Sequence, residues 1–395
     1  METKKLKQIA QDLKAKIEAG LKKDGTEIQC LPTYITPKTA DINGQAVVLD
    51  LGGTNYRVAR VDFVNGTPSI HPENGWKRDL SEMKNEGFTQ EDLFKAQADP
   101  IGEININGTI PIGYCFSYPA ESLTSGDAQL LRWTKGVDIK EMLGKPVGKP
   151  LMAYLKDKKK IEFSSIKVIN DTVASLFAGL TRSGYDAYIG LIVGTGTNMA
   201  AFMRSDKIDK LDPAQKTGGF IPVNLESGNF HPQHLTVYDE MVDANSDNQG
   251  AQRFEKAISG MYLGEIFKSA FPLDEFEEKF DAQKLTTMLS YPAAYKDEYV
   301  KTARWLYERS AQLVAASLAG LLLVLLTHDA AIKNVLLTAE GSLFWSTNRN
   351  GKHYADMVLD ELHNLLTDFG HSNVKVEILQ MDNANLIGTA IAALS

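Results

Sequence analysis

The sequence predicts an α/β protein built from two similar halves, and three observations lead to this prediction. The chain has 395 residues, which is long for one ordinary hydrophobic core, so two domains are expected. A unit of apolar strand, Gly-containing turn and second apolar strand occurs twice, at 45–68 and at 188–203. Strands alternate with helices through the rest of the chain. Two copies of one unit indicate two related halves around a cleft.

The composition is that of a soluble globular protein. Apolar residues make up 43% of the chain and charged residues 23%. The formal net charge of −8 argues against a nucleic-acid partner, because its phosphates would be repelled. The two cysteines, Cys30 and Cys115, are too few for a disulfide scaffold and fit a reducing, cytoplasmic location.

Two apolar segments raise the question of a membrane. Residues 1–23 lack the continuous apolar stretch of a signal peptide, and their apolar residues recur at helical spacing from Leu6 to Ile17. They predict a helix docked on the protein surface; the alternative, a helix on a membrane surface, lacks an aromatic anchor. The apolar run 313–326 is shorter than the ~18–20 residues that cross a bilayer. It predicts a buried core helix, and no membrane partner is expected.

The turn of the first repeated unit has the composition of a phosphate-binding turn. Gly52 and Gly53 let the backbone approach a phosphate closely, and successive amides form an anion-binding nest. Asp50 cannot bind phosphate, but it can hold a hydrated Mg²⁺ or orient the turn. An ordinary Gly-Gly hairpin explains this turn equally well. The candidate nucleotide-binding residues here are Asp50, Gly52, Gly53, Thr54, Asn55 and Arg57.

The second unit repeats these ingredients in Gly194-Thr195-Gly196-Thr197-Asn198, after the strand 188–193. Two such turns favour a clamp on both ends of a triphosphate, which suits phosphoryl transfer, where catalysis is mostly positioning and charge stabilisation. A P-loop is excluded because no GxxxxGK[ST] motif occurs.

Asp171 is the candidate general base. It lies between a predicted strand at 166–169 and a predicted helix at 172–180. A sugar hydroxyl is a poor nucleophile at neutral pH, and a carboxylate within reach can take its proton. A simple helix N-cap is the alternative role, and the two are compatible because a capping Asp stays ionised.

A sugar site needs several polar groups in a fixed geometry, and short segments supply them. Taken alone, each residue is typical of a solvated surface or a cap, and Glu255 of an exposed ion pair on a helix. The candidates are Ser117, which follows a predicted strand at 110–116, together with Thr134, Lys135, Asn170, Glu226 and Glu255.

Together these segments resemble the hexokinase family, in the family's order and over most of the chain. The matching segments are LDLGGTNYRV at 49–58, FSYP at 116–119, WTKG at 133–136, NDTV at 170–173, GTGTN at 194–198, FEKAISGMYLGE at 254–265 and GSLF at 341–344. The first and fifth are similar to the family's two phosphate motifs, the second and third to its sugar-binding signature, and the last to its adenosine-side motif.

The resemblance implies an actin-like ATPase fold with two ribonuclease-H-like domains that close over the sugar. It implies a small domain of 45–170, to which a C-terminal helix at 385–395 returns, and a large domain of 1–44 and 171–384. The implied reaction moves the γ-phosphoryl group of ATP, carried with Mg²⁺, to the 6-hydroxyl of glucose, mannose or fructose, as the first step of glycolysis. A monomer or homodimer is expected.

The resemblance also implies roles for single residues. Asp171 deprotonates the 6-hydroxyl, and Lys135 stabilises charge on the moving phosphoryl group. The implied hexose-binding residues are Ser117, Thr134, Lys135, Asn170, Asp171, Asn198, Glu226 and Glu255. The implied nucleotide-binding residues are Asp50, Gly52, Gly53, Thr54, Asn55, Arg57, Gly194, Thr195, Gly196, Gly341 and Ser342. Mg²⁺ is expected to arrive with ATP and to lie near Asp50 through water.

The chain departs from the family pattern at three places. The family's Glu-Trp-Gly-Ala-Phe reads ESGNF at 226–230, its Asn-Pro-Gly-Gln-Gln reads DNQGAQ at 247–252, and its Gly-Ser-rich C-terminal stretch reads DNANL at 382–386. The first change motivates an alternative, a sugar-sensing protein that kept the fold and lost the reaction. Intact Asp171, Lys135 and phosphate turns argue against it. A third interpretation, a small bacterial glucokinase or repressor-type kinase, usually needs a Cys-rich zinc motif that two distant cysteines cannot supply.

Overall fold

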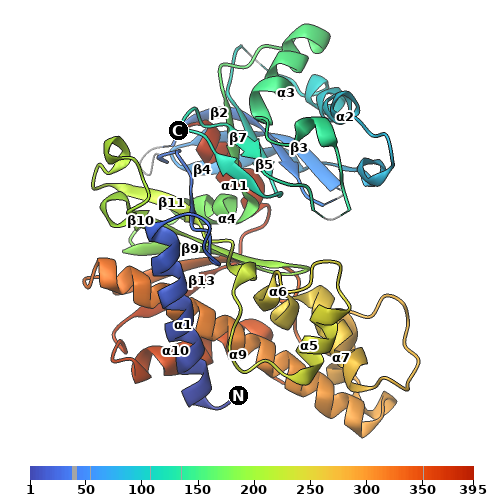
Figure 1. The fold of residues 1–395 in the computed structure, drawn as a ribbon. Helices are drawn as coiled ribbons and strands as arrows, with labels where there is room; N and C mark the ends of the chain where they lie inside the picture. The colour runs from blue at the N-terminus through green and yellow to red at the C-terminus, as the bar shows by residue number, and fades with distance from the viewer. Residues whose placement is uncertain (38–41, 54, 107, 135, 350) are drawn as a thin grey trace.

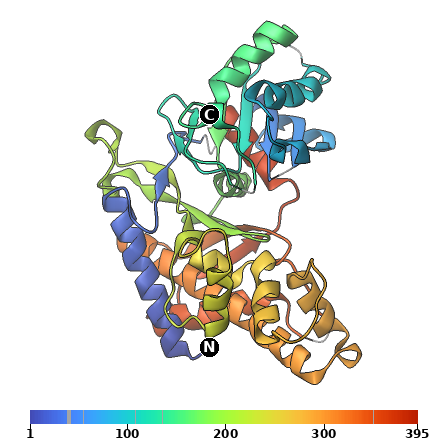
Figure 2. The ribbon, with the colours of Figure 1, turned by 45° about the vertical axis from the view of Figure 1, so that its right-hand side comes forward.

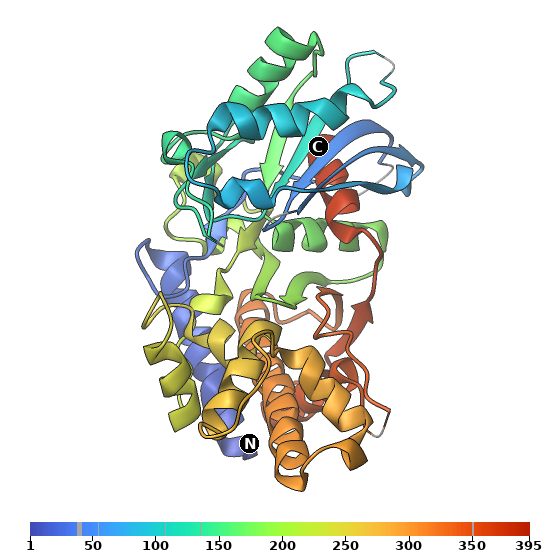
Figure 3. The same ribbon diagram turned by 90° about the vertical axis from the view of Figure 1, so that its right-hand side faces the viewer.

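The protein consists of two α/β lobes stacked end to end (Figure 1). The computed structural model describes residues 1–37, 42–53, 55–106, 108–134, 136–349 and 351–395, with the backbone alone at 73 and 74. The chain begins in the lower lobe and ends against the upper lobe, and turning the molecule by 45° and by 90° shows the same two bodies (Figures 2 and 3).

The upper lobe contains a five-stranded sheet. Its order is β4 (Thr67–Asp79), β3 (Asn55–Val64), β2 (Gly44–Leu51), β5 (Ile112–Phe116) and β8 (Ile166–Ile169). The first three strands are antiparallel, and β5 and β8 continue parallel to β2. Helices α2 (Gln90–Gly102) and α3 (Gly148–Tyr154) and the hairpin β6 (Ala120–Ser122) and β7 (Ala128–Leu130) complete this lobe. The strand expected from residue 110 begins at Ile112.

The lower lobe repeats this topology. Its sheet has the order β1 (Leu31–Pro32), β11 (Phe220–Asn224), β10 (Thr197–Arg204), β9 (Ala187–Val193), β12 (Asn334–Glu340) and β13 (Lys375–Leu379). From β11 to β13 the directions match those of the upper sheet: three antiparallel strands, then two parallel ones. The two halves expected from the repeated unit are therefore confirmed.

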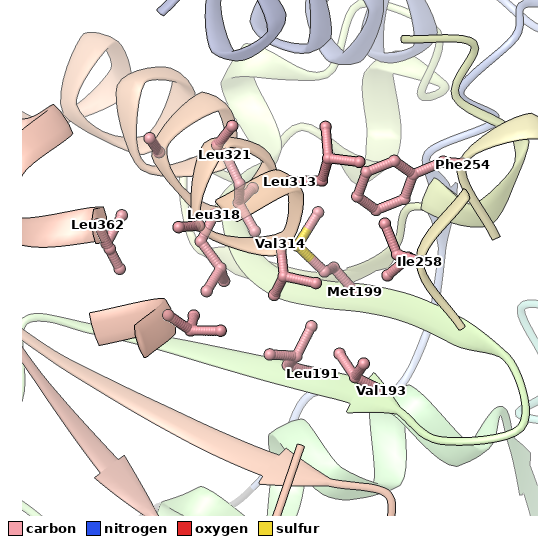
Figure 4. Packing of buried hydrophobic residues seen from close by; sticks show 14 of the residues in the cluster. Leu191, Val193, Met199, Phe254, Ile258, Leu313, Val314, Leu318, Leu321 and Leu362 are labelled. Atoms are coloured by element: carbon pink, nitrogen blue, oxygen red, sulfur yellow. The ribbon is translucent and has the colours of Figure 1, made fainter. Parts of the chain in front are cut away.

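The long helix α9 (Asp297–His328) forms the centre of the lower core. Its apolar segment is long enough by length and composition to span a membrane, but 89% of that segment is buried inside the protein. Figure 4 shows Val314 and Leu318 of this helix on the side that faces the strands β9 and β10. The labelled members of this buried cluster are Leu191, Val193, Met199, Phe254, Ile258, Leu313, Val314, Leu318, Leu321 and Leu362. The expected core helix is confirmed, and it is longer than its apolar run.

Further helices surround this core. Helix α1 (Thr3–Lys22) packs on α9 and buries Leu6, Ile9, Leu13 and Ile17, as its spacing predicts. The other helices are α5 (Val237–Ala244), α6 (Arg253–Ile258), α7 (Gly260–Ala270), α8 (Ala282–Ser290) and α10 (Tyr354–Asp368). Single turns of 3₁₀ helix occur at Ser81–Lys84, Lys140–Met142, Gly179–Thr181, Ser205–Lys207, Pro213–Gln215, Ser227–Asn229 and Pro292–Ala294, and a π turn at Leu155–Lys159.

Two helices, α4 (Asp171–Ala178) and α11 (Ala384–Ala393), pack against each other between the sheets. Helix α4 contacts β9, β10 and β12 of the lower sheet, whereas α11 contacts β2, β5 and β8 of the upper sheet. A Cβ atom at Gly388 would lie 1.8 Å from the carbonyl oxygen of Ala174. Glycine at this position therefore sets how closely the two helices approach. The domain boundaries near 45, 171 and 385 stay predictions.

Replacing Gly388 with Ala should destabilise the protein. Inside a helix alanine is normally about 1 kcal/mol more favourable than glycine. Here, however, the added methyl group collides with rigid backbone, and such overpacking costs about 1–3 kcal/mol or more. We expect urea unfolding to give a free energy of unfolding lower than that of the wild type by about 2 kcal/mol.

Gly102→Ala is the matched control for this test. A Cβ atom at Gly102 meets its nearest neighbour, Ile161, at 3.9 Å, an ordinary contact, so this variant should be as stable as the wild type or slightly more so. Equal stabilities of Gly388→Ala and Gly102→Ala would contradict the close helix contact.

Candidate active site

Asp171 lies at the start of α4, directly after strand β8. It is the first helical residue, and the N-cap is Asn170, whose side chain accepts from the backbone amide of Thr172 at 2.9 Å. The alternative role of Asp171 as the N-cap is therefore wrong, because Asn170 has the extended backbone that a cap requires. Asp171 Oδ1 also accepts from the Thr172 amide, at 2.7 Å. Its carboxylate is held at the positive end of a helix.

The first phosphate turn is held by an ion pair at its base. Asp50 is buried at the end of β2, and its Oδ2 accepts from Arg57 Nη2 at 2.6 Å and Nε at 3.1 Å. Arg57 Nη1 donates to Asn383 Oδ1 at 2.9 Å, just before α11. The guanidinium thus ties the turn to the segment that enters α11. Its contact with phosphate stays a prediction, and Thr54 lies outside the described residues.

The segment FSYP lies beside this turn. The Ser117 amide donates to the Leu51 carbonyl at 3.1 Å, and the Tyr118 hydroxyl donates to the Gly53 carbonyl at 2.8 Å. The rings of Tyr118 and Trp133 meet edge to face with centroids 4.8 Å apart. The segment with Trp133 therefore packs against FSYP beside the first turn, and the role of Thr134 stays a prediction. Lys135, the predicted charge-stabilising residue, lies outside the described residues.

The second phosphate turn contacts the segment GSLF. A Cβ atom at Gly341 would lie 2.2 Å from the Val193 carbonyl oxygen, and Gly341 has a φ of +110°. Glycine is therefore required at this crossing. The Phe344 amide donates to the Val193 carbonyl at 3.0 Å. The turn at Gly194–Gly196 thus lies against Gly341, with the side chains of Thr195 and Ser342 exposed.

Glu340 is a site residue that the sequence reasoning missed. It ends strand β12 directly before Gly341, and it interacts electrostatically with Asp50 and Asp171. Burial, reinforced by these two negative charges, raises the pKa of Glu340 to about 7. Carboxyl groups from β2, α4 and β12 therefore lie near enough to influence one another where the two lobes join. A carboxylate at a strand end beside a glycine turn was the available signal.

The lower sugar-side residues form one hydrogen-bonded group. Asn198 Nδ2 donates to Asn224 Oδ1 at 2.7 Å, and Asn224 Nδ2 donates to Glu226 Oε1 at 2.8 Å. The backbone amide of Ser227 donates to Asn198 Oδ1 at 3.1 Å. Asn224, at the end of β11, is another residue that the sequence reasoning missed. Its only sequence signal was its position two residues before Glu226.

Glu255 lies against the second turn and is partly buried there, rather than exposed on the surface of a helix. Its Oε2 accepts from the Thr197 amide at 3.0 Å, and a Cβ atom at Gly196 would approach that oxygen to 2.6 Å. Its neighbours on α6 are buried and anchored, because both Arg253 and Lys256 donate to the Asp243 carboxylate. The ion pairs of α6 therefore belong to its buried face, while Glu255 projects toward the turn.

Residues of the two lobes meet at the sugar side. Asn170 of the upper lobe and Asn224 of the lower lobe line the same small cavity of about 20 Å³, which has room for one water molecule. The predicted residues thus fall into two connected groups. Asp50, Ser117, Asn170 and Asp171 lie at the upper sheet and α4, and Asn198, Glu226 and Glu255 lie at the lower sheet.

Comparisons with known proteins agree on one family. A family model described as Hexokinase matches residues 1–181, and a second with the same description matches 188–300. Hexokinase-2 of Solanum tuberosum is 34% identical over 278 residues, which cover 67% of this chain and only 55% of that protein. Hexokinase-2 of Schizosaccharomyces pombe is 28% identical over 446 aligned positions, covering 99% of this chain and 94% of that protein.

The fold comparison agrees with the sequence comparisons. A solved hexokinase of Schistosoma mansoni, complexed with glucose, has a TM-score of 0.80 and 24% identity, and the match covers 100% of this chain and 96% of that one.

The carboxyl group of Glu340 should make stability fall as pH rises. In the unfolded chain this group titrates near 4.5, and in the folded protein near 7. Between these values the folded state holds a proton that the unfolded state has lost, so raising the pH favours unfolding. Glu340→Gln is neutral at every pH. Relative to the wild type, its free energy of unfolding should increase by up to about 3 kcal/mol from pH 4.5 to pH 7 and then level off.

Urea unfolding at pH 5 and pH 8 measures this difference, with the exposed Glu278→Gln as control. The control should differ from the wild type by the same amount at both pH values. A Glu340→Gln difference that is equally constant would show that folding does not raise the pKa of Glu340.

Proposed function

Because this chain belongs to the hexokinase family, we propose that it transfers the γ-phosphoryl group of MgATP to the 6-hydroxyl of a hexose. Glucose, mannose and fructose are the candidate acceptors. The two repeated sheets form the actin-like ATPase fold that the sequence resemblance implied. The observation that carries the proposal is the position of Asp171 at the start of α4, next to Asn170, which lines one cavity with Asn224 of the lower lobe.

On the acceptor side, a hexose presents hydroxyls that both donate and accept. Glu226 and Glu255 offer carboxylate oxygens, and Asn170 and Asn198 offer amides. Asp171 is the proposed base, because its carboxylate is anchored through the Thr172 amide and can take the proton of the 6-hydroxyl as the new P–O bond forms. Fixing both reactants in this way supplies most of the rate enhancement expected in phosphoryl transfer.

On the nucleotide side, the two glycine turns are proposed to hold the phosphates from opposite lobes. Gly52 and Gly53 follow β2, and Gly194–Gly196 lie against Gly341. Ser342, exposed beside Gly341, is the candidate contact on the adenosine side. We propose that the lobes close over the bound sugar, since water in an open site would compete as phosphoryl acceptor.

The described residues fit a metal that is carried by the nucleotide. They contain no group of three His, Cys, Asp or Glu side chains arranged to hold a metal ion alone. Asp50 keeps one oxygen engaged by Arg57, and Mg²⁺ typically retains several waters and binds through one or two carboxylates plus phosphates. We therefore propose that Asp50 acts on Mg²⁺ through water. The ion supplies neutralisation of phosphate charge when ATP is bound.

The altered segment at 226–230 is the observation behind the second candidate, a sugar sensor without catalysis. Ser227, where the family has Trp, is buried, and its amide still bonds to Asn198. Glu226 keeps its bond to Asn224. These contacts favour an intact sugar site and hence the kinase. We further propose that the enzyme acts in the cytoplasm at the entry to glycolysis, a location that suits the buried free thiols Cys30 and Cys115.

An initial-rate panel of hexoses with MgATP tests the proposed function. We expect ADP and hexose 6-phosphate to form in equal amounts from at least one of glucose, mannose and fructose. Calorimetry with sugar and a non-hydrolysable ATP analogue runs alongside. Sugar binding without turnover would favour the sensor. If the protein neither binds nor turns over any of these sugars, both candidates are rejected.

Replacing Asp171 with Asn should lower kcat by about 10²–10⁴-fold, the usual contribution of general base catalysis, because the amide cannot accept the proton. Sugar affinity should change far less, since the amide preserves size and an acceptor oxygen. Asp209→Asn, at an exposed position, is the matched control and should keep the wild-type rate. A near-normal rate in Asp171→Asn would refute the assignment of the base.

A further inference from the structure

Asn224 occupies the centre of the polar group on the lower sheet. It is buried, with only 4% of its surface exposed, at the last position of β11. Its side chain bonds to two predicted hexose-binding residues, one through each end of the amide: Asn198 at 2.7 Å and Glu226 at 2.8 Å. The Glu226 amide also donates to its Oδ1, at 3.4 Å.

The direction of these hydrogen bonds follows from chemistry. An ionised carboxylate can only accept, so Glu226 requires the NH₂ end of Asn224. The Asn224 oxygen must then face Asn198, which in turn has to present its own NH₂ group. Asn198 Oδ1 points the other way and accepts from the amides of Met199 and Ser227. The chain of donors therefore has one possible order, set by a carboxylate at one end and two backbone N–H groups at the other.

Glu226 needs this support because its backbone is unusual. It has a φ of +58°, in the left-handed region that residues other than glycine rarely adopt. The bond from Asn224 and the turn at Ser227–Asn229 that starts directly after it hold this conformation. An observed backbone outlier that is held by its surroundings is characteristic of functional sites.

We propose that Asn224 is a positioning residue for the hexose. It orients Asn198 so that an N–H group faces one sugar hydroxyl, and it orients Glu226 so that a carboxylate oxygen faces a neighbouring hydroxyl. The first hydroxyl then accepts a hydrogen bond and the second donates one. This inference rests on the proposed function. Asn224 does not itself take part in phosphoryl transfer, and it acts through the two residues that it orients.

Asn224→Asp separates this role from a merely structural one. Aspartate has the same shape, but as a carboxylate it cannot donate to Glu226 and repels it. At pH 8 we expect the KM for the hexose to rise at least tenfold, with kcat at saturation within about threefold of the wild type, as for lost ground-state binding. Two carboxyl groups that share a site raise the pKa of one of them. At pH 6 one of the two carboxyl groups holds a proton and can again donate a hydrogen bond. The KM of Asn224→Asp at pH 6 should therefore be close to that of the wild type measured at the same pH.

Asn245→Asp is the control, since Asn245 is exposed at the end of α5. It should follow the wild type at both pH values. A wild-type KM in Asn224→Asp at pH 8, or a loss of the same size at pH 6 and pH 8, would overturn the inference.

A double-mutant cycle covers the case in which Asn224→Asp fails to fold. Calorimetry gives the hexose Kd for Asn224→Ala, Glu226→Ala and the double variant. Because Asn224 acts through Glu226 as well as Asn198, the loss in affinity of the double variant should be clearly smaller than the product of the two single losses, whereas independent effects would multiply and refute the proposal. If the wild type binds the hexose without turnover, the kinase function is rejected, but this cycle can still be interpreted. If the wild type binds no hexose, both the kinase function and the positioning role of Asn224 are rejected.

Discussion

The close packing of α4 on α11 is the constraint on which the rest of the site depends. The carbonyl of Ala174 approaches Gly388 so closely that no side chain fits between the helices. Helix α4 packs mainly on the lower sheet and α11 on the upper sheet, so this contact helps to set the distance between the lobes at the base of the site. Asp171 begins α4, and Asn383, which binds Arg57, directly precedes α11. The positions of the proposed base and of the first phosphate turn are therefore both fixed by the same pair of helices.

The repeated topology explains why the chemistry gathers at this place. In both sheets an antiparallel hairpin continues into parallel strands, and the ends of parallel strands meet at one edge. Asp50 ends the upper copy of the central strand, and Glu340 ends a strand of the lower copy. Because α4 passes between the sheets, Asp171 joins them. Burial, together with the negative charges of Asp50 and Asp171, raises the pKa of Glu340 to about 7, so its proton is retained at pH values where an exposed glutamate is ionised.

Hydrogen bonds connect the described polar residues on the lower side of the sugar site. The buried ion pairs of the lower lobe, Arg309 with Asp239 and Lys256 with Asp243, lie behind the site and anchor α5, α6 and α9 to one another. Glu255, which faces the turn, accepts a hydrogen bond from a backbone amide. In the upper lobe an ion pair lies at the site itself, since Arg57 binds Asp50 at the first phosphate turn.

The sequence by itself determined the elements and the family. Periodicity identified α1 and α9, because an apolar face must be buried, and glycine-containing turns after apolar strands identified the repeated unit. Motifs of the hexokinase family named most of the site. Glu340 and Asn224 could not be found in this way, because their importance lies in contacts with residues far away in the sequence. Only the tertiary structure brought Glu340 next to Asp50 and Asp171, and only it showed that Asn170 rather than Asp171 caps α4. The physical reason is that a pattern along the chain reports local preference and burial, whereas the environment of a polar group is decided by what folds against it.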